Sequence, residues 1–240
     1  CVRDGGDWVI NGEKIFITNS TLPGYIVVFC KDVEKDGKIT NIIVPKNAKG
    51  YSTPKLVEKM GMNGMEVADV VLEDVRVPFE NTTGGEAGRG KGFPILTTEI
   101  AIGKLGISAE CLGMAQGALE EAIKYAKERT QRGKPISSFQ TIQWLLGEMS
   151  ADVEASRYYL YALAYWKSQK KDILFDSART RLFVSQATHR VTSNAMQVLG
   201  AFSYSKEFNV ERIFRDMKLA EIYEGVNEIQ RVMAAAGVLR

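Results

Sequence analysis

The chain has 240 residues, enough for one large domain or two modest ones with a substantial buried core. Its net charge of +2 and the absence of any Lys/Arg block argue against a nucleic-acid partner. No stretch is long and apolar enough for a membrane span, so no membrane partner is expected either.

Cysteine and histidine usage excludes two further kinds of site. Cys1, Cys30 and Cys111 lie far apart without a C-x-x-C pair, so neither a disulfide framework nor a zinc site is expected, and a reducing compartment fits best. His189 is the only histidine, which argues against a multi-histidine metal centre and a Ser-His-Asp triad. We expect a solvated or packed His189.

The N-terminal third of the chain has the alternation and β-branched content of strands. Asn11-Gly12, between Trp8–Ile10 and Lys14–Thr18, predicts a hairpin with a type I′ turn. Further strands are expected at Tyr25–Cys30, Thr40–Val44 and Ala68–Val77, with Asp36-Gly37 joining the first two. Because no helical pattern intervenes, the sheet should be mostly antiparallel, as a small barrel or sandwich.

From Gly92 onward the apolar spacing becomes helical. The first helix begins near Phe93 and should end around Gly133 and Pro135. Further helices are expected over 137–168, 176–199, 210–217 and from Asn227 onward, the last with Gln230 placed for a capping box. Long helices with short connections favour an antiparallel bundle. The sequence therefore predicts an α+β fold, with a small antiparallel β domain over 1–84 and a helical-bundle domain over 85–240.

Single motifs are weak when taken alone. Gly85–Gly92 resembles a phosphate-binding loop, but Gly92 stands where the metal-binding hydroxyl belongs, so a flexible linker is the better interpretation. Glu224 precedes a predicted helix and is followed by Gly225, which lets a ligand approach the backbone closely. Alone, such a glutamate is more typical of a carboxylate that stabilises a helix start.

The ordered set of motifs is much more specific. The set comprises Phe16-Ile17-Thr18, the Glu-Arg-x-x-x-Gly-Lys-Pro run over Glu128–Pro135, Phe139-Gln140, Gln197–Gly200, Phe214-Arg215-Asp216, Ile222-Tyr223-Glu224-Gly225 and Asn227–Arg231. In this order, from Trp8 to Arg240, the chain resembles the acyl-CoA dehydrogenase family. The start at Cys1 without an initiator Met reads as a piece of a longer protein, and the resemblance implies that the family's N-terminal helical domain is missing.

The resemblance implies a reaction and a catalytic residue. Such enzymes oxidise an acyl-CoA to the 2-enoyl-CoA with FAD as acceptor. Glu224 matches the base that removes the α-proton, while a hydride passes from the β-carbon to the flavin. Gly225 and Lys104 match substrate-side positions, although many members carry Arg in place of Lys104. Some branches of the family place the base at the position of Gly103, which has no side chain that can act.

The resemblance also implies FAD contacts from several parts of the chain. The expected cofactor-binding residues are Phe16, Ile17 and Thr18 at the flavin ring, Arg129 and Gln140 at the diphosphate and adenosine, Gln197, Val198, Leu199, Gly200 and Ala201 at the FAD of a partner subunit, and Val226, Asn227 and Glu228 beside the base. Shared FAD implies a homodimer or a homotetramer, and an electron-transfer flavoprotein is the expected electron acceptor. The expected location is the cytoplasm of a bacterium or the mitochondrial matrix of a eukaryote.

Three departures from the family pattern leave alternatives open. Arg132 replaces an aromatic residue, Val226 replaces a common Thr, and Gly200–Tyr204 replaces a more glycine-rich run. These changes keep open a non-catalytic scaffold that has lost FAD. An enoyl-CoA-type reductase on the same fold also remains open, since the same base and flavin serve both directions.

Overall fold

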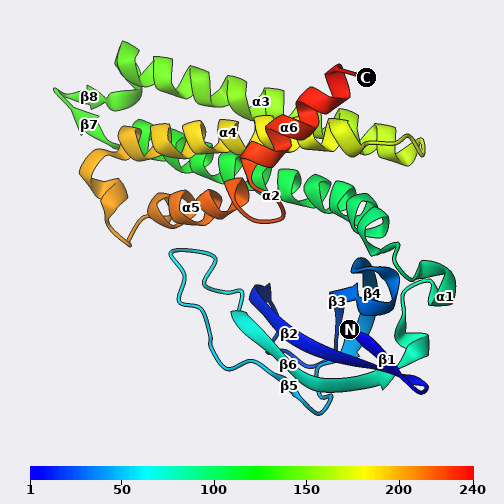
Figure 1. Ribbon diagram of the computed structural model, residues 1–240. Helices are drawn as coiled ribbons and strands as arrows, with labels where there is room; N and C mark the ends of the chain where they lie inside the picture. Colours follow the sequence, from blue (N-terminus) through cyan, green and yellow to red (C-terminus); the bar gives the residue numbers. More distant parts are fainter. The chain divides into compact units, whose positions relative to one another are not determined.

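The computed structural model describes all residues, Cys1–Arg240, and the chain forms two compact units, Cys1–Thr98 and Glu99–Arg240. The N-terminal unit is built mainly of strands and the C-terminal unit mainly of helices (Figure 1). The predicted α+β class is confirmed. None of the helices combines the length and the apolar character that crossing a membrane requires.

The N-terminal unit consists of two antiparallel sheets. Strands β1 (Val2–Asp4), β2 (Asp7–Thr18), β6 (Val67–Pro78) and β5 (Tyr51–Ser52) form the larger sheet in that order, and β3 (Tyr25–Asp32) pairs with β4 (Lys38–Pro45). Alternate residues of these strands point inward, as the pleat requires. They form one core that includes Trp8, Ile10, Val28, Ile42, Val44, Val70 and Val75.

The hairpin predicted at Asn11-Gly12 is wrong. Both residues lie inside β2, which pairs with β6 along its length and shifts register between Ile10 and Gly12. The Asn11 side chain donates from Nδ2 to the Asp74 carboxylate at 2.9 Å and accepts from the Asp74 N–H at 2.7 Å. Pairing with β6 thus outweighs the local turn signal, and the chain reverses instead between β1 and β2.

Arg89 anchors the segment after α1 (Gly85–Gly88) to the strands, so this stretch is not a free linker. Its guanidinium makes a bidentate pair with Asp32 at 2.8 and 2.9 Å and also bonds Glu34 at 2.9 Å. The Arg89 and Asp32 side chains are 5% and 0% exposed. Burial alone raises the pKa of Asp32, but the hydrogen bonds and the charge of Arg89 together outweigh burial, and the pKa lies below its ordinary value.

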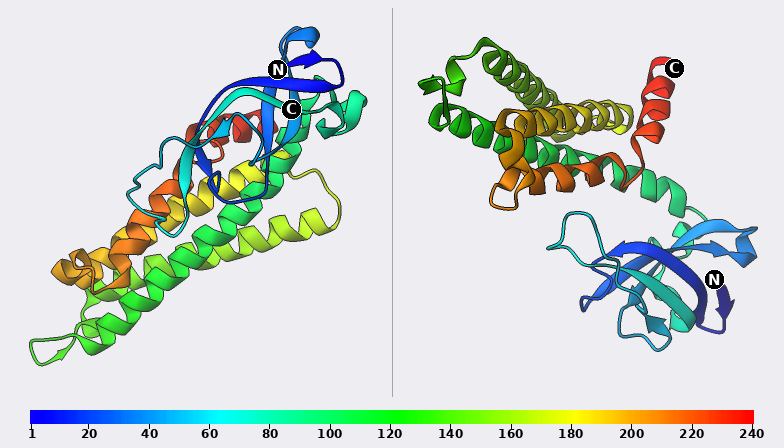
Figure 2. Two further views of the ribbon diagram at one scale, coloured as in Figure 1. Left: turned by 90° about the horizontal axis from the view of Figure 1, so that it is seen from below. Right: turned by 90° about the vertical axis from the view of Figure 1, so that its left-hand side faces the viewer.

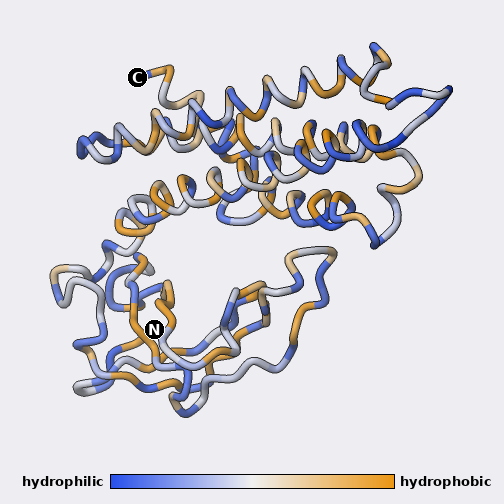
Figure 3. Tube along the Cα trace, turned by 180° about the vertical axis from the view of Figure 1, so that it is seen from behind, coloured by the Kyte–Doolittle hydropathy of each residue, from blue (hydrophilic) through white to orange (hydrophobic).

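The C-terminal unit is a helical bundle. Its helices are α2 (Gly92–Glu128, whose first turns belong to the N-terminal unit), α3 (Gln140–Ser168), α4 (Leu174–Leu199), α5 (Asn209–Met217) and α6 (Asn227–Val238). Figure 2 shows α2, α3 and α4 running alongside one another. Helix α4 is central, because it contacts α3, α5 and α6. Hydrophobic and hydrophilic residues alternate along the long helices (Figure 3), which fits their one-sided burial.

The connections of the bundle are short. Helix α2 ends at Glu128 rather than near Gly133, because residues 130–135 form a small hairpin, β7 (Thr130–Gln131) with β8 (Lys134–Pro135). Arg132 and Gly133 take its two turn positions, with φ of 53° and 75°. The 3-10 helices η3 (Ile136–Ser138), η4 (Gly200–Tyr204) and η5 (Lys218–Glu221) complete the connections in this unit.

Replacing Arg89 should destabilise the N-terminal unit strongly. Arg89→Met leaves the Asp32 carboxylate buried without its cation, and we expect a loss of about 3 kcal/mol in the free energy of unfolding at neutral pH. Because the pKa of Asp32 is lowered in the folded chain, the contribution of the pair is present above the unfolded value of about 3.9 and is lost as pH falls below it.

Urea unfolding measures this effect. The control is Arg76→Met, which removes an exposed pair with Asp4 and should change the unfolding midpoint little. Equal losses from the two variants would contradict the role given to Arg89.

Candidate active site

The segment between α5 and α6 carries Glu224 on a sharp turn. Glu224 and Gly225 have φ of 47° and 91°, so both residues adopt left-handed backbone conformations. Glycine accepts this conformation freely, but for a glutamate it is uncommon and costs on the order of 1 kcal/mol or more. The Glu224 side chain is exposed in this chain. Such a turn persists only where surrounding groups hold it.

A buried arginine of α4 holds the turn. Arg181 is 0% exposed, and its Nη1 donates to the carbonyl oxygens of Glu224 at 2.8 Å and Gly225 at 2.6 Å. Its Nη2 donates to the carbonyls of Ala220 at 3.2 Å and of Tyr223. Burial lowers the pKa of Arg181 from its ordinary value, without a carboxylate paired to it. The Arg181 guanidinium therefore holds this turn through hydrogen bonds to its main-chain carbonyl oxygens.

Gly103 of α2 provides the space for the Glu224 carboxylate. A Cβ built on Gly103 would lie 2.6 Å from Oε2 of Glu224, so the carboxylate occupies the volume that any other residue there would need. No hydrogen bond or ion pair within the chain engages this carboxylate, and the Glu224 N–H has no acceptor either. A carboxylate without a partner in the chain, carried by a turn whose backbone is held, is available to accept a proton as a general base does.

Two other ionisable groups nearby stay neutral at ordinary pH. Tyr223 donates from its hydroxyl to Glu110 at 2.6 Å, and its pKa is raised by burial and by the Glu110 charge. Burial raises the pKa of Cys111 to about 12. Glu224 is therefore the uncommitted acid-base group of this turn.

Lys104 lies next to Gly103 but is only 1% exposed. Its Nζ has a single partner, the Sδ of Met233 at 3.2 Å, which is a weak acceptor. Burial and the positive charge of Arg181 lower the pKa of Lys104 to about 8. Its assignment to the substrate remains a prediction.

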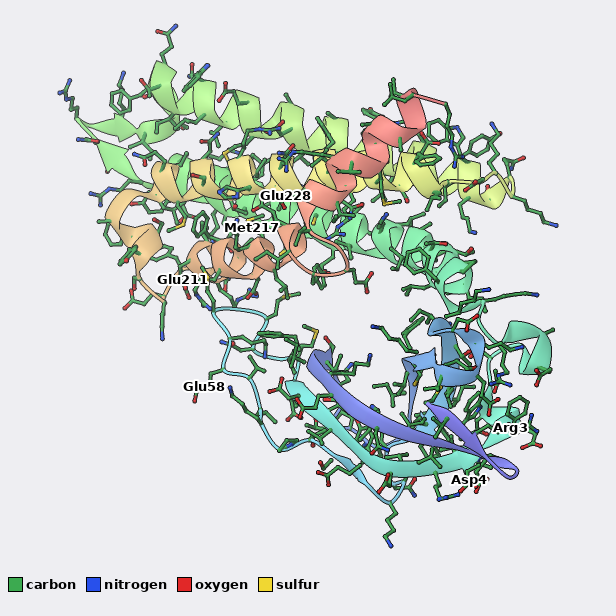
Figure 4. The ribbon with its side chains drawn as sticks, in the orientation of Figure 1. Arg3, Asp4, Glu58, Glu211, Met217 and Glu228 are labelled. Carbon is green, nitrogen blue, oxygen red and sulfur yellow. The ribbon has the colours of Figure 1, made fainter.

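The residues predicted beside the base differ in what they do within the chain. Val226 precedes α6 and provides no side-chain cap, and the buried Asn227 bonds Ser185 of α4 instead. The predicted capping box is therefore wrong, because Gln230 donates to the Gly225 carbonyl at 2.8 Å. Glu228, at the first turn of α6 (Figure 4), is exposed and pairs with Arg231 at 3.3 Å.

A second group of predicted residues gathers at the end of the bundle that bears the β7–β8 hairpin (Figure 1). The exposed Arg129 has no ion-pair partner, and its guanidinium lies 5.6 Å from the ring centroid of Phe202 in η4. Gly200 and Ala201 begin η4 and are exposed, as are Gln140 at the start of α3 and Gln197. Val198 and Leu199 instead pack their side chains into the core.

Phe16, Ile17 and Thr18 belong to the N-terminal unit, at the end of β2. A register shift between Lys14 and Ile17 turns Phe16 outward with φ of 55°, and its side chain is 65% exposed. Ile17 and Thr18 pair with Ala68 and Val67 of β6. Bulges of this kind re-aim side chains and are common next to functional sites.

Arg181 and Gln230 are the two side chains that hold the Glu224 turn. The sequence analysis did not single out Arg181, and it gave Gln230 a different partner. The spacing of residues on α4 does contain a signal for Arg181. Arg181 lies on the same helix face as Ala178, Ser185 and Thr188, and a charged residue among small buried ones needs an internal partner.

Comparisons with known proteins bear on both units. Residues 1–75 match the model of the acyl-CoA dehydrogenase middle domain, and residues 90–239 match that of the acyl-CoA dehydrogenase C-terminal domain. The short-chain specific acyl-CoA dehydrogenase of Clostridium acetobutylicum is 38% identical over 241 residues, which cover 100% of this chain and 63% of the relative. A caffeyl-CoA reductase-Etf complex subunit, CarC, of Acetobacterium woodii is 36% identical over 240 residues, 99% of this chain and 62% of the relative.

A solved structure agrees with this. Butyryl-CoA dehydrogenase from Megasphaera elsdenii superposes with a TM-score of 0.95 at 37% identity, over 100% of this chain and 62% of that one. The chain thus spans just under two thirds of the length of these relatives.

A side chain at position 103 should compete with the Glu224 carboxylate for space, and this competition should lower the stability gained by replacing Gly103 with alanine. Alanine in a helix interior normally stabilises by roughly 0.5–1 kcal/mol relative to glycine. We expect this gain for Gly106→Ala, where a Cβ meets nothing within 4 Å, but a smaller gain for Gly103→Ala, where the end of the Glu224 side chain must move aside. Adding Glu224→Ala should restore the gain at Gly103, as measured by urea unfolding in a double-mutant cycle. Equal gains at both glycines with Glu224 intact would show that the Glu224 carboxylate does not occupy the space beside Gly103.

The buried Lys104 should give the chain a stability that rises with alkaline pH. Its pKa is about 8 in the folded chain and near 10.4 unfolded, so between these values the unfolded chain binds more protons and stability increases with pH. Lys104→Met should remove this increase and stabilise the chain at pH 7 by about 2–3 kcal/mol. Lys124→Met, at an exposed position of α2, should retain the increase. A flat profile for the parent chain between these pH values would refute the prediction.

Proposed function

Because the chain belongs to the acyl-CoA dehydrogenase family, we propose that it serves an FAD-dependent oxidation of an acyl-CoA thioester to the 2-enoyl-CoA. The observation that carries the proposal is the uncommitted carboxylate of Glu224, held on a left-handed turn over Gly103. This chemistry needs a base of this kind, because the α-proton of a thioester is only weakly acidic.

Glu224 can serve the proton transfer in two ways. Its carboxylate accepts the α-proton, and its free backbone N–H is available to donate to the thioester carbonyl, where negative charge develops as the proton leaves. Gly225, without a side chain, leaves room for the substrate beside the base. When bound, FAD supplies the acceptor for the hydride that leaves the β-carbon.

The residues proposed for FAD have suitable chemistry. Arg129 offers an exposed guanidinium without a carboxylate partner, which suits bidentate contact with a diphosphate. Gly200 adopts φ of 60° with open space around it, so a ligand can approach the backbone there. Phe16 offers an exposed aromatic face. These features favour a flavoprotein over a scaffold that has lost FAD.

A homo-oligomer, a dimer or a tetramer, is part of the proposal. Helix α3 exposes a row of large aromatic side chains, Trp144, Tyr158, Tyr161 and Tyr165, each at least 60% exposed. Exposed aromatic clusters of this kind are typical of protein interfaces. An electron-transfer flavoprotein is the proposed acceptor of the electrons, which the name of the Acetobacterium woodii relative supports.

The second candidate is a reductase of enoyl-CoA esters. The same relative is named a caffeyl-CoA reductase, at nearly the same identity as the dehydrogenases. The same base and flavin serve oxidation and reduction, so the substrate and the electron partner determine which of the two reactions the protein catalyses. Anaerobic bleaching of the flavin by a panel of acyl-CoAs, beginning with short chains, supports the dehydrogenase. Reoxidation of the reduced flavin by 2-enoyl-CoAs alone supports the reductase.

Replacing Glu224 should abolish the reaction. In the full-length flavoprotein, Glu224→Gln removes the proton acceptor with little change in size, and we expect the rate of flavin bleaching by acyl-CoA to fall at least 100-fold. Stopped-flow absorbance measures it. Glu154→Gln, an exposed glutamate of α3, is the matched control and should bleach at the parent rate. Bleaching of Glu224→Gln at the parent rate would disprove the assignment of the base.

A further inference from the structure

We propose that Arg181 is the positioning residue of the base: its guanidinium fixes the backbone conformation that places the Glu224 carboxylate over Gly103. The inference rests on the proposed function, in which Glu224 removes the substrate's α-proton. Arg181 makes no hydrogen bond to the Glu224 carboxylate itself and acts through the main chain of the turn.

The hydrogen bonds of Arg181 match the turn closely. Its two Nη nitrogens carry four N–H donors, and these meet four carbonyl oxygens, those of Ala220, Tyr223, Glu224 and Gly225. Three of the acceptors are consecutive residues centred on the base. A planar guanidinium presents its donors in a rigid fork, so the four oxygens are fixed relative to one another as well as to α4.

The conformation of the turn requires such a fixed frame. A glutamate with φ of 47° lies outside the broad basins that non-glycine residues prefer, and without restraint the backbone would relax toward them. That relaxation rotates the Cα–Cβ bond of Glu224 and moves its carboxylate away from Gly103. Gln230 is a second restraint, but it bonds only the Gly225 carbonyl, at 2.8 Å.

The charge of Arg181 also acts on the site. The residue is fully buried and forms no ion pair, so carbonyl dipoles and the Tyr223 ring, whose centroid lies 5.9 Å from Cζ, surround its charge within the chain. Its ionisable neighbours are Glu224, Tyr223, Cys111 and Lys104. Tyr223 bonds Glu110, Cys111 is a buried thiol and Lys104 is a cation, so Glu224 is the one carboxylate among these neighbours.

The test uses the full-length holoenzyme with three arginine variants. Arg181→Met should lower kcat about 100-fold, the scale expected when a catalytic group is displaced by about 1 Å, while KM and flavin absorbance change little. Arg181→Lys keeps the charge but has too few donors for four carbonyls, so we expect an intermediate loss of about 10-fold. Arg190→Met, on the exposed side of α4, is the control and should match the parent.

The primary isotope effect with α-deuterated acyl-CoA separates positioning from mere stability. A displaced base makes α-proton removal more rate-limiting, so the effect should rise in both Arg181 variants and stay at the parent value in Arg190→Met. A variant that is only less stable would lose active protein without changing the isotope effect of what remains.

Several results would overturn the inference. Parent values of kcat and isotope effect in a flavin-bound Arg181→Met would do so, and if that variant does not fold, parent values in Arg181→Lys decide equally. Glu224→Gln, run alongside, separates the two proposals. If it keeps the parent rate, the assignment of the base fails; if it is inactive while the Arg181 variants are unaffected, only the positioning role fails.

Discussion

The close packing of α4 against its neighbours is the constraint on which the candidate site depends. The buried face of this helix consists largely of small side chains, among them Ala178, Ser185 and Thr188. Small residues let neighbouring backbones approach, and Thr188 bonds the Cys111 carbonyl of α2 directly at 3.1 Å. Because α4 also packs against α6, the turn before α6 lies within reach of Arg181. A bulkier face on α4 would separate the guanidinium from the carbonyls it holds.

Periodicity predicted the strands and helices well, because it reflects which side of each element is buried. It failed where pairing with another segment of the chain determines the local structure. Asn11-Gly12 has the composition of a turn, but β6 offers β2 a partner along its length, and Asp74 takes the Asn11 side chain. Likewise, the end of α2 at Glu128 depends on the hairpin after it. Local signals mark where a turn is possible, and long-range pairing determines whether it forms.

The candidate site divides in the same way. The sequence singles out Glu224, because short motifs and their order carry the family resemblance, and its role as the base stays a prediction. The sequence marked Gly103 only as a position without a usable side chain, and the fit of the Glu224 carboxylate against it comes from the structure. The small buried neighbours of Arg181 indicate that it needs an internal partner, but they do not identify that partner. Its acceptors lie some forty residues away and are main-chain atoms that leave no trace in the sequence. Gln230 was noticed but assigned to the wrong partner, since a capping box and a bond to Gly225 require the same residue at nearly the same spacing.

The reliance on main-chain acceptors affects how this part of the chain can evolve. Carbonyl oxygens are common to all residues, so the side chain of Ala220 can be exchanged without removing a hydrogen-bond acceptor of Arg181. Inserting or deleting one residue between Ala220 and Gly225 would move several oxygens out of reach together. Within this turn, length should therefore be under stronger selection than composition, with Glu224 and the glycine after it as the exceptions.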